Sequence, residues 1–171
     1  MIELAQRAPR DAVATASLTL PWERRSVTRQ KVRLDDGRDA GLFLPRGEIL
    51  RGGDRLASTS GEIVAIVAAP EAVLVVRAPD PQALARAAYH LGNRHVAVEV
   101  GEGMLMLERD HVLEDMLLGL GVSVEEAMLP FEPEPGAYAH GNAHSHEALG
   151  PLAARIVSPA PHRHRHGGAH G

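Results

Sequence analysis

The chain has 171 residues, a formal net charge of −4 and no cysteine, and 44% of its residues are hydrophobic while only 3% are aromatic. This length is enough to bury a mainly aliphatic core, and the missing cysteines exclude disulfides and thiolate metal ligands. The negative charge, with no Lys or Arg run longer than two, argues against nucleic acid as a partner.

The sequence contains no segment of the roughly 18 consecutive apolar residues that a membrane helix requires. Its first 20 residues lack the apolar core of a signal peptide. We therefore expect a cytoplasmic protein without a membrane partner.

Residues 1–70 predict a small N-terminal all-β domain. Alternating or apolar segments suited to short strands occupy 13–20, 30–34, 40–44 and 61–68. Sequences that favour tight turns lie between them, DDG, LPRG and GGD.

Residues 71–100 change in character. The continuous apolar run EAVLVVRA at 71–78 is typical of a strand buried on both faces. Asp80 and Pro81 favour a helix start, and Gly92-Asn93 favours its end. Apolar residues at helical spacing mark the buried face of this helix: Leu84, Ala87, Ala88 and Leu91. VAVEV at 96–100 predicts the next strand.

Residues 101–131 complete a second domain. GEG at 101–103 predicts a turn and MLMLE at 104–108 a hairpin strand. Asp110 is placed to cap a second helix, and 123–131 predicts a last strand. The order βαββαβ over 71–131 predicts a ferredoxin-like domain, and the whole chain an α+β fold. Apolar residues give the second helix its buried face: Leu113, Met116, Leu117 and Leu120.

From about Glu132 to residue 171 the sequence is rich in Pro, Gly, Ala and His, which predicts a disordered tail. Closely spaced imidazoles can wrap one divalent ion, and imidazole suits Ni, Cu and Zn. The alternatives are a purification tag, which the interleaved Arg163 and Arg165 disfavour, and a tail without a role. Seven of the ten histidines lie here and are candidate ligands: His140, His144, His146, His162, His164, His166 and His170.

Two other histidines fall at one edge of the predicted sheet. His95 precedes the strand at 96–100, and His111 begins the second helix. If the hairpin centres on Glu102, the two lie on the order of 10 Å apart, because neighbouring strands are ~4.8 Å apart. His95 could instead be a turn residue that donates to a backbone carbonyl, and His111 an ordinary exposed residue. His90 falls on the helix face opposite the apolar stripe, which favours a solvated position.

Three segments together resemble one family, the UreE nickel metallochaperones of urease maturation. They are LPRGEILRGGD at 44–54, YHLGNRH at 89–95 and RDHVLEDMLLGLG at 109–121, followed by the His-rich C-terminus. The resemblance spans nearly the whole chain. It implies an N-terminal domain similar to a peptide-binding module, a ferredoxin-like metal-binding domain, and a homodimer formed through the latter.

The resemblance also implies roles for individual residues. His95, in GNRH, is implied to be a nickel ligand contributed by both subunits, and His111 an accessory ligand. Arg109 departs from members that have a histidine there, which weakens a second folded site. The implied partners are the accessory GTPase UreG and the urease apoprotein complex, with Ni²⁺ as cargo and Zn²⁺ or Cu²⁺ as ions bound in vitro.

Three other functions compete with this interpretation. A metal hydrolase would use carboxylates near His111, but the chain has no H-E-x-x-H and no nucleophile–base motif, so we expect no enzyme activity. An RNA-binding module shares the βαββαβ order but needs stacking aromatics that VAVEV and MLMLE lack. A general Ni, Zn or Cu buffer or storage protein using the tail alone is the strongest competitor.

Overall fold

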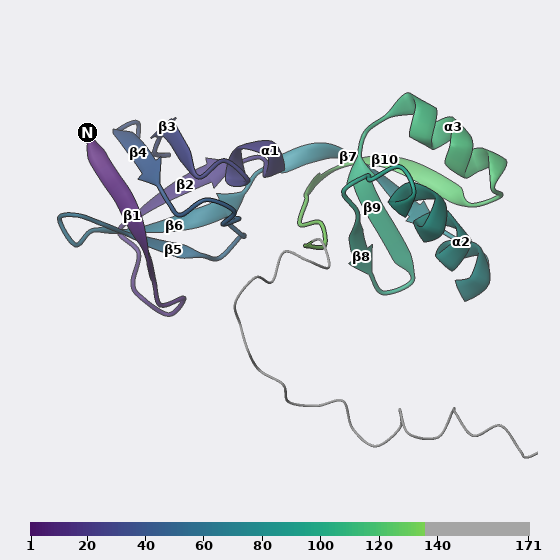
Figure 1. Cartoon of the computed structure of the whole chain (residues 1–171), viewed down its shortest axis with the longest axis horizontal. Helices are drawn as coiled ribbons and strands as arrows, with labels where there is room; N and C mark the ends of the chain where they lie inside the picture. The colour runs from purple at the N-terminus through teal and green to yellow at the C-terminus, as the bar shows by residue number, and fades with distance from the viewer. Residues whose placement is uncertain (136–171) are drawn as a thin grey trace, which may run out of the picture. The chain divides into compact units, whose positions relative to one another are not determined.

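In the computed structural model of the chain, residues 1–135 are described, and their strands form two separate sheets (Figure 1). The N-terminal unit, as we call it, contains β1 to β6 and the short helix α1. The C-terminal unit contains β7 to β10 with α2 and α3. The fold is mixed, with many strands and few helices, as the sequence predicts.

The N-terminal unit is one six-stranded sheet in the order β2-β6-β5-β1-β4-β3. Its core is aliphatic and includes Leu4, Leu18, Leu42 and Ile66. The elements are β1 (Ile2–Ala8), β2 (Ala16–Leu20), α1 (Trp22–Arg25), β3 (Arg29–Arg33), β4 (Asp39–Phe43), β5 (Arg55–Ser58) and β6 (Ile63–Ala68).

The strands predicted within 13–68 are confirmed as β2, β3, β4 and β6, with shorter bounds. Three elements were not predicted: β1, β5 and α1. The prediction of an all-β unit is therefore wrong at Trp22–Arg25, where one helical turn follows Pro21. The helix was not predicted because its four residues, WERR, are too few to show a helical period.

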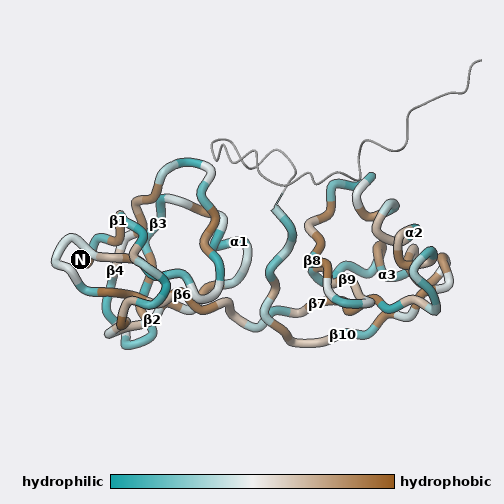
Figure 2. The backbone as a smooth tube through the Cα atoms, turned by 90° about the horizontal axis from the view of Figure 1, so that it is seen from below, coloured by the Kyte–Doolittle hydropathy of each residue, from teal (hydrophilic) through white to brown (hydrophobic). Residues whose placement is uncertain are grey.

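The C-terminal unit is a four-stranded antiparallel sheet in the order β10-β7-β9-β8. The elements are β7 (Pro70–Arg77), α2 (Pro81–Gly92), β8 (Glu99–Gly101), β9 (Met104–Glu108), α3 (His111–Gly119) and β10 (Ser123–Pro130). This is the predicted element order. Residues 73–76 of β7 are buried, because both faces of this strand are covered, and Figure 2 shows the hydrophobic stretch there.

Both helices pack on the same face of this sheet. Leu91 of α2 and Leu117 of α3 share a core with Leu74 and Leu107 of the strands. The other face buries Val73 and other residues against the chain that follows β10. The predicted apolar stripe of α2 is therefore confirmed. That of α3 is confirmed at Leu113, Met116 and Leu117, whereas Leu120 follows the end of the helix and does not belong to this core.

The strand predicted at 96–100 is wrong in its first half. β8 begins only at Glu99 and pairs with β9 from Glu99↔Met106 onward. Before it, the Val98 carbonyl accepts a hydrogen bond from Glu134 N (2.8 Å) instead of pairing with β9. The segment from Glu132 to residue 135, assigned from sequence to the tail, thus lies along β8.

Candidate metal centre

His95 occupies the left-handed position that ends α2. Its φ is 55°. Its amide donates to the Gly92 carbonyl (3.0 Å), and the Val96 amide donates to the Leu91 carbonyl (3.3 Å). This pair of hydrogen bonds is the Schellman motif, in which the left-handed residue is usually glycine.

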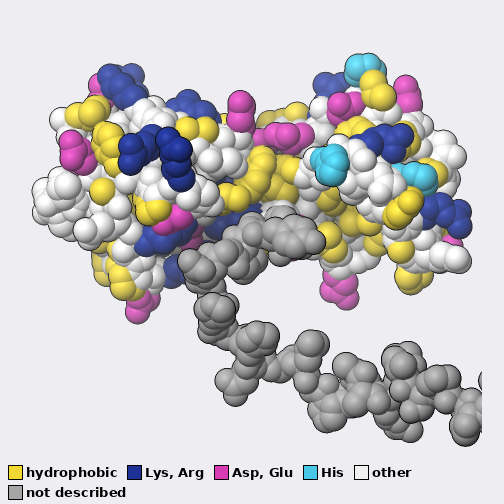
Figure 3. All heavy atoms as spheres, viewed as in Figure 1, with side chains coloured by type: hydrophobic (Ala, Val, Ile, Leu, Met, Phe, Trp, Pro, Cys, Tyr) yellow, Lys and Arg dark blue, Asp and Glu magenta, His cyan; other side chains and the backbone are white. Residues whose placement is uncertain are grey.

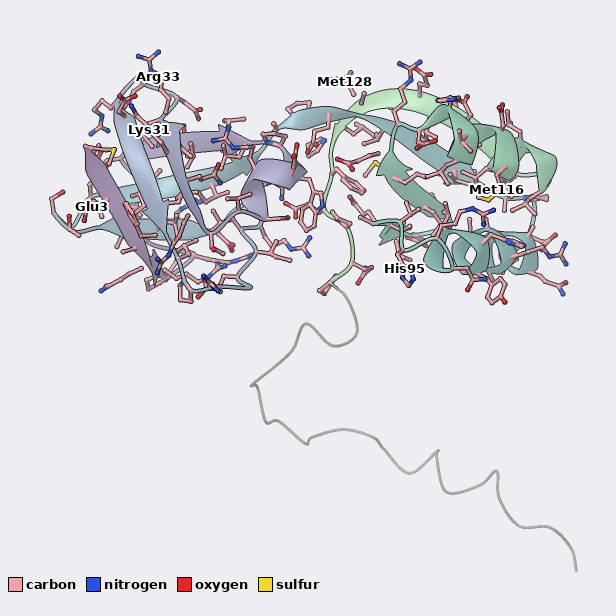
Figure 4. All side chains as sticks on the ribbon, turned by 45° about the horizontal axis from the view of Figure 1, so that its top comes forward. Glu3, Lys31, Arg33, His95, Met116 and Met128 are labelled. Carbon is pink, nitrogen blue, oxygen red and sulfur yellow. The ribbon has the colours of Figure 1, made fainter. Side chains whose placement is uncertain are left out.

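Among residues 1–135, His95 is the one non-glycine residue with a positive φ. A side chain in this conformation costs about 1–3 kcal/mol relative to an ordinary backbone geometry. Its side chain is exposed and points away from the end of α2, as Figure 4 shows. The strained backbone therefore holds an imidazole out towards solvent.

The alternative that His95 is a turn residue donating to a backbone carbonyl is met by its amide, which donates to the Gly92 carbonyl, while its ring makes no hydrogen bond to any other described residue. The residue is indeed part of a turn, but through its backbone amide alone. Both ring nitrogens thus stay open to a ligand from outside the described residues.

A mainly apolar hollow of about 290 Å³ adjoins this corner. It is lined by residues of α2, of the loop after it, of β8 and of the chain end: Ala88, Gly92, Val96, Ala97, Val98, Val100, Glu134 and Pro135. Val100 is 57% exposed and the nearby Tyr89 of α2 is 65% exposed. The surface around His95 is therefore more apolar than a solvated loop usually is.

His111 is the first residue of α3 and is exposed. The preceding Asp110 caps the helix, since one carboxylate oxygen accepts from Val112 N (2.8 Å) and Leu113 N (3.0 Å). His111 lines a hollow of about 340 Å³ with Arg109 and Asp110.

Arg109, at the position where a second histidine would strengthen a folded site, is held in another interaction. Its Nε donates to Glu126 Oε1 on β10 at 2.8 Å. The residue therefore joins the loop after β9 to β10 and offers no ligand to a metal.

The third described histidine, His90, lies on α2 as predicted but is not fully solvated. It is partly covered, and its ring packs edge-on against Tyr89, with 5.5 Å between the ring centroids. In Figure 3 the described histidines form three separate patches on the C-terminal unit.

No group of three or more His, Asp or Glu side chains suited to one metal ion occurs among residues 1–135. The hairpin centred on Glu102, from which His95 and His111 were predicted to lie close together, does not extend to the corner, because pairing of β8 with β9 stops at Glu99↔Met106. The 10 Å separation of His95 and His111 stays a prediction. The seven tail histidines lie outside the described residues.

The carboxylates near His111 are engaged elsewhere. Burial raises the pKa of Glu108, and the charges of Glu71 and Glu23 raise it further. Glu108 thus faces other carboxylates, while Asp110 caps a helix.

The two sheets coincide with two family models. The model of the UreE urease accessory protein N-terminal domain matches residues 2–69, and that of the C-terminal domain matches residues 71–171. Together they define a chain of two domains, with the junction next to residue 70.

Relatives from several bacteria match most of the chain. A urease accessory protein UreE of Citrobacter koseri is 55% identical over 150 residues, which is 85% of this chain and 99% of the relative. The one from Cupriavidus necator is 55% identical over 85% of this chain and 72% of its own. The one from Pseudomonas putida strain W619 is 53% identical, over 81% and 86%.

This chain belongs to the UreE family of urease accessory proteins. The resemblance of the three sequence segments is therefore confirmed. Each relative is named as an accessory protein of urease and not as urease itself. Within residues 1–135, the helices are all too short or too polar to cross a membrane.

Proposed function

We propose that this protein is a nickel metallochaperone, which binds Ni²⁺ through His95 and delivers it for assembly of the urease active site. The observation that carries the proposal is the placement of His95. An exposed imidazole stands where glycine would be locally favoured, in a chain of the UreE family. Histidine at this position lowers local stability but provides an accessible metal ligand.

The coordination sphere is completed by a second copy of the chain. One described histidine cannot saturate a transition metal, and a two-fold dimer supplies each ligand twice. The exposed apolar surface around His95, including Val100, supports a dimer contact there. The strand order β10-β7-β9-β8 supports the ferredoxin-like assignment of this dimerisation domain.

The histidine tail gathers ions for this site. His140 follows Pro135 by five residues, which extend at most ~18 Å, and Pro135 lines the hollow next to the His95 corner. A ligand tethered this closely acts at a high effective concentration. The tail ligands are His140, His144, His146, His162, His164, His166 and His170.

His111 serves as an accessory ligand, supported by its exposure. Nickel passes in the cytoplasm to urease through a complex with the GTPase UreG and the urease apoprotein. An open site of imidazoles suits such transfer, because a closed cage would hold its ion too firmly. Zn²⁺ and Cu²⁺ bind the same imidazoles in vitro.

A general Ni, Zn or Cu buffer is the competing function. It is favoured by one observation, that residues 1–135 of a single chain form no cluster of three potential ligands. In that case the tail would bind all the metal and His95 none.

Nickel titration separates the two functions. Titrations of the full chain, of His95→Ala and of a chain ending at Pro135 should show that truncation lowers the stoichiometry but keeps one tight site per dimer. His95→Ala in the truncated chain should remove that site. Loss of all tight binding on truncation alone would favour the buffer, and unchanged tight binding in the truncated His95→Ala chain would contradict the role of His95. Binding should also weaken below about pH 6, because protons compete for imidazoles, which titrate near ~6.5 in model peptides.

A further inference from the structure

Among residues 1–135, a single charged residue lines the hollow beside the end of α2. The lining is otherwise alanine, valine, glycine and proline, and the exception is Glu134. Gly92 and Val96, which also line the hollow, belong to the turn that presents His95. Figure 4 shows the described chain ending on the side of the C-terminal unit where the His95 side chain lies. An acidic side chain and the candidate ligand thus share one part of the surface.

The backbone holds Glu134 at this place. Phe131 is fully buried on the helix-free face of the C-terminal sheet. Glu132 N then donates to Glu99 Oε2 (2.6 Å), and Glu134 N donates to the Val98 carbonyl (2.8 Å). These contacts use a ring and two backbone amides, so the position of residue 134 does not depend on its carboxylate. A substitution that keeps the amide should therefore keep the position.

The Glu134 carboxylate, unlike its neighbours, has no partner among residues 1–135. The carboxylate of Glu132 lies 2.8 Å from Arg25 Nη1. The cation closest in sequence to the candidate ligand, Arg94, donates from Nη1 to the His90 carbonyl (3.1 Å) and forms no ion pair. The Glu134 side chain is exposed, and no described side chain forms a hydrogen bond or ion pair with it. Its negative charge is therefore available to a ligand.

An ion at His95 brings a charge that the imidazoles do not cancel. A ligating imidazole is neutral, so two His95 rings, one from each chain of a dimer, leave the two positive charges of Ni²⁺ in place. At an apolar contact between two chains such a charge is unfavourable unless an anion pairs with it. Glu134 occurs once in each chain, so two-fold symmetry supplies two negative charges at the same centre. The metal and the two carboxylates together are neutral.

We infer that Glu134 supplies the negative charge of the nickel centre, and that its carboxylate in each chain faces the ion held by the two His95 rings and strengthens its binding. This role of Glu134 rests on the proposed function of His95. The carboxylate acts through its charge, since imidazole is the better ligand for nickel. Without metal the two carboxylates repel each other across the dimer contact. Glu134 should thus favour the dimer only when the ion is bound.

Nickel affinity, measured by competition with a chelator, tests this role. The parent is the full-length chain with its seven tail histidines changed to alanine, because a chain ending at Pro135 would add a terminal carboxylate beside Glu134. Glu134→Gln should bind about tenfold to a hundredfold more weakly, and Glu134→Asp, which keeps the charge, within about threefold of the parent. The matched control is Glu125→Gln, which removes the same charge from an exposed position on β10, at the opposite edge of the sheet from β8. It should leave the affinity unchanged.

The dissociation constant of the dimer in EDTA provides a second readout. Here Glu134→Gln should tighten the dimer about twofold to tenfold, the reverse of its effect on nickel binding, because it removes the repulsion of two carboxylates. Weakening of both nickel binding and the metal-free dimer would indicate a structural role and overturn the inference. So would equal nickel affinity of Glu134→Gln and the parent while His95→Ala loses tight binding, a result that supports the proposed function. Absence of tight binding in the parent would instead contradict the proposed function, and this role of Glu134 with it.

Discussion

The two helices of the C-terminal unit end differently. α3 is followed by Gly121 with φ of 80°, and a Cβ added there would meet nothing within 4 Å. α2 is followed by His95 in the same left-handed region, with φ of 55°. The left-handed position after the helix is thus occupied by glycine in one case and by histidine in the other.

The difference separates stability from function within one small fold. At α3 the residue is what backbone sterics favour. At α2 histidine is tolerated, because His is among the residues enriched in the left-handed region, but it is not the most stable choice. The contrast identifies the end of α2 as the place where the chain requires a particular side chain.

The largest expected effect on stability is at the end of α3, where glycine occupies the left-handed position. Gly121→Ala should lower the free energy of unfolding by about 1–2 kcal/mol, because the cost of a left-handed alanine is one of backbone conformation alone. Urea denaturation measures it. Gly119→Ala, inside α3 with open space around its Cβ, is the control and should be neutral or stabilising; equal losses in both would contradict the interpretation.

The start of α3 should be the next most sensitive point. Asp110→Ala removes the acceptor of two amides and should cost about 1 kcal/mol, whereas Asp110→Asn should retain most of the cap. Thermal unfolding of the two variants provides the comparison. Similar losses in both would mean that the charge of Asp110, and not its capping oxygen, supports the helix.

At the end of α2, where histidine occupies the left-handed position, a change to glycine should increase stability. His95→Gly should raise the free energy of unfolding by about 0.5–1 kcal/mol in metal-free protein, because relief of the left-handed strain exceeds the greater entropy of unfolded glycine. His95→Ala keeps a Cβ and should give no such gain. A clear loss of stability in His95→Gly would show that the imidazole stabilises the fold.

The smallest effect concerns Glu108, next to the start of α3. Its pKa is raised above 4.5 in the folded protein, by burial and then by Glu71 and Glu23. Such a carboxyl group favours folding when protonated and opposes it as pH rises through its folded pKa. Glu108→Gln should therefore be more stable at pH 7 by about 0.3 kcal/mol or less, given the screening of a partly exposed group. The difference should vanish as the pH falls below 4.5, and a difference that grew in acid would contradict this.

The sequence predicts the C-terminal unit best, because its signals are local. The apolar run of β7, the stripes of α2 and α3, and the caps Asp80 and Asp110 all appear in the structure. β1 was missed because the polar–apolar alternation of IELAQRA breaks after Leu4, and β5 because its four residues, RLAS, are too few to show a period.

The remaining errors arise from contacts distant in sequence. VAVEV alternates like a strand, but the Val98 carbonyl accepts a hydrogen bond from Glu134 N instead of pairing with β9. The Pro- and Glu-rich residues after 131 were assigned to the tail, although Glu132 forms an ion pair with Arg25. The left-handed backbone of His95 was also not predicted. Gly92 and Asn93 were assigned to the helix stop, and the Schellman hydrogen bonds place the turn two residues later.

The most direct test of the central claim uses His95→Gly in a chain ending at Pro135, with nickel affinity measured by competition with a chelator. Because this variant should fold at least as stably as its parent, lost binding cannot be ascribed to unfolding. We expect the parent to bind one Ni²⁺ per two chains tightly and the variant to bind at least about tenfold more weakly, as the loss of about 1.4 kcal/mol or more in ligation implies. Equal affinity in the two proteins would contradict the assignment of His95 as the nickel ligand.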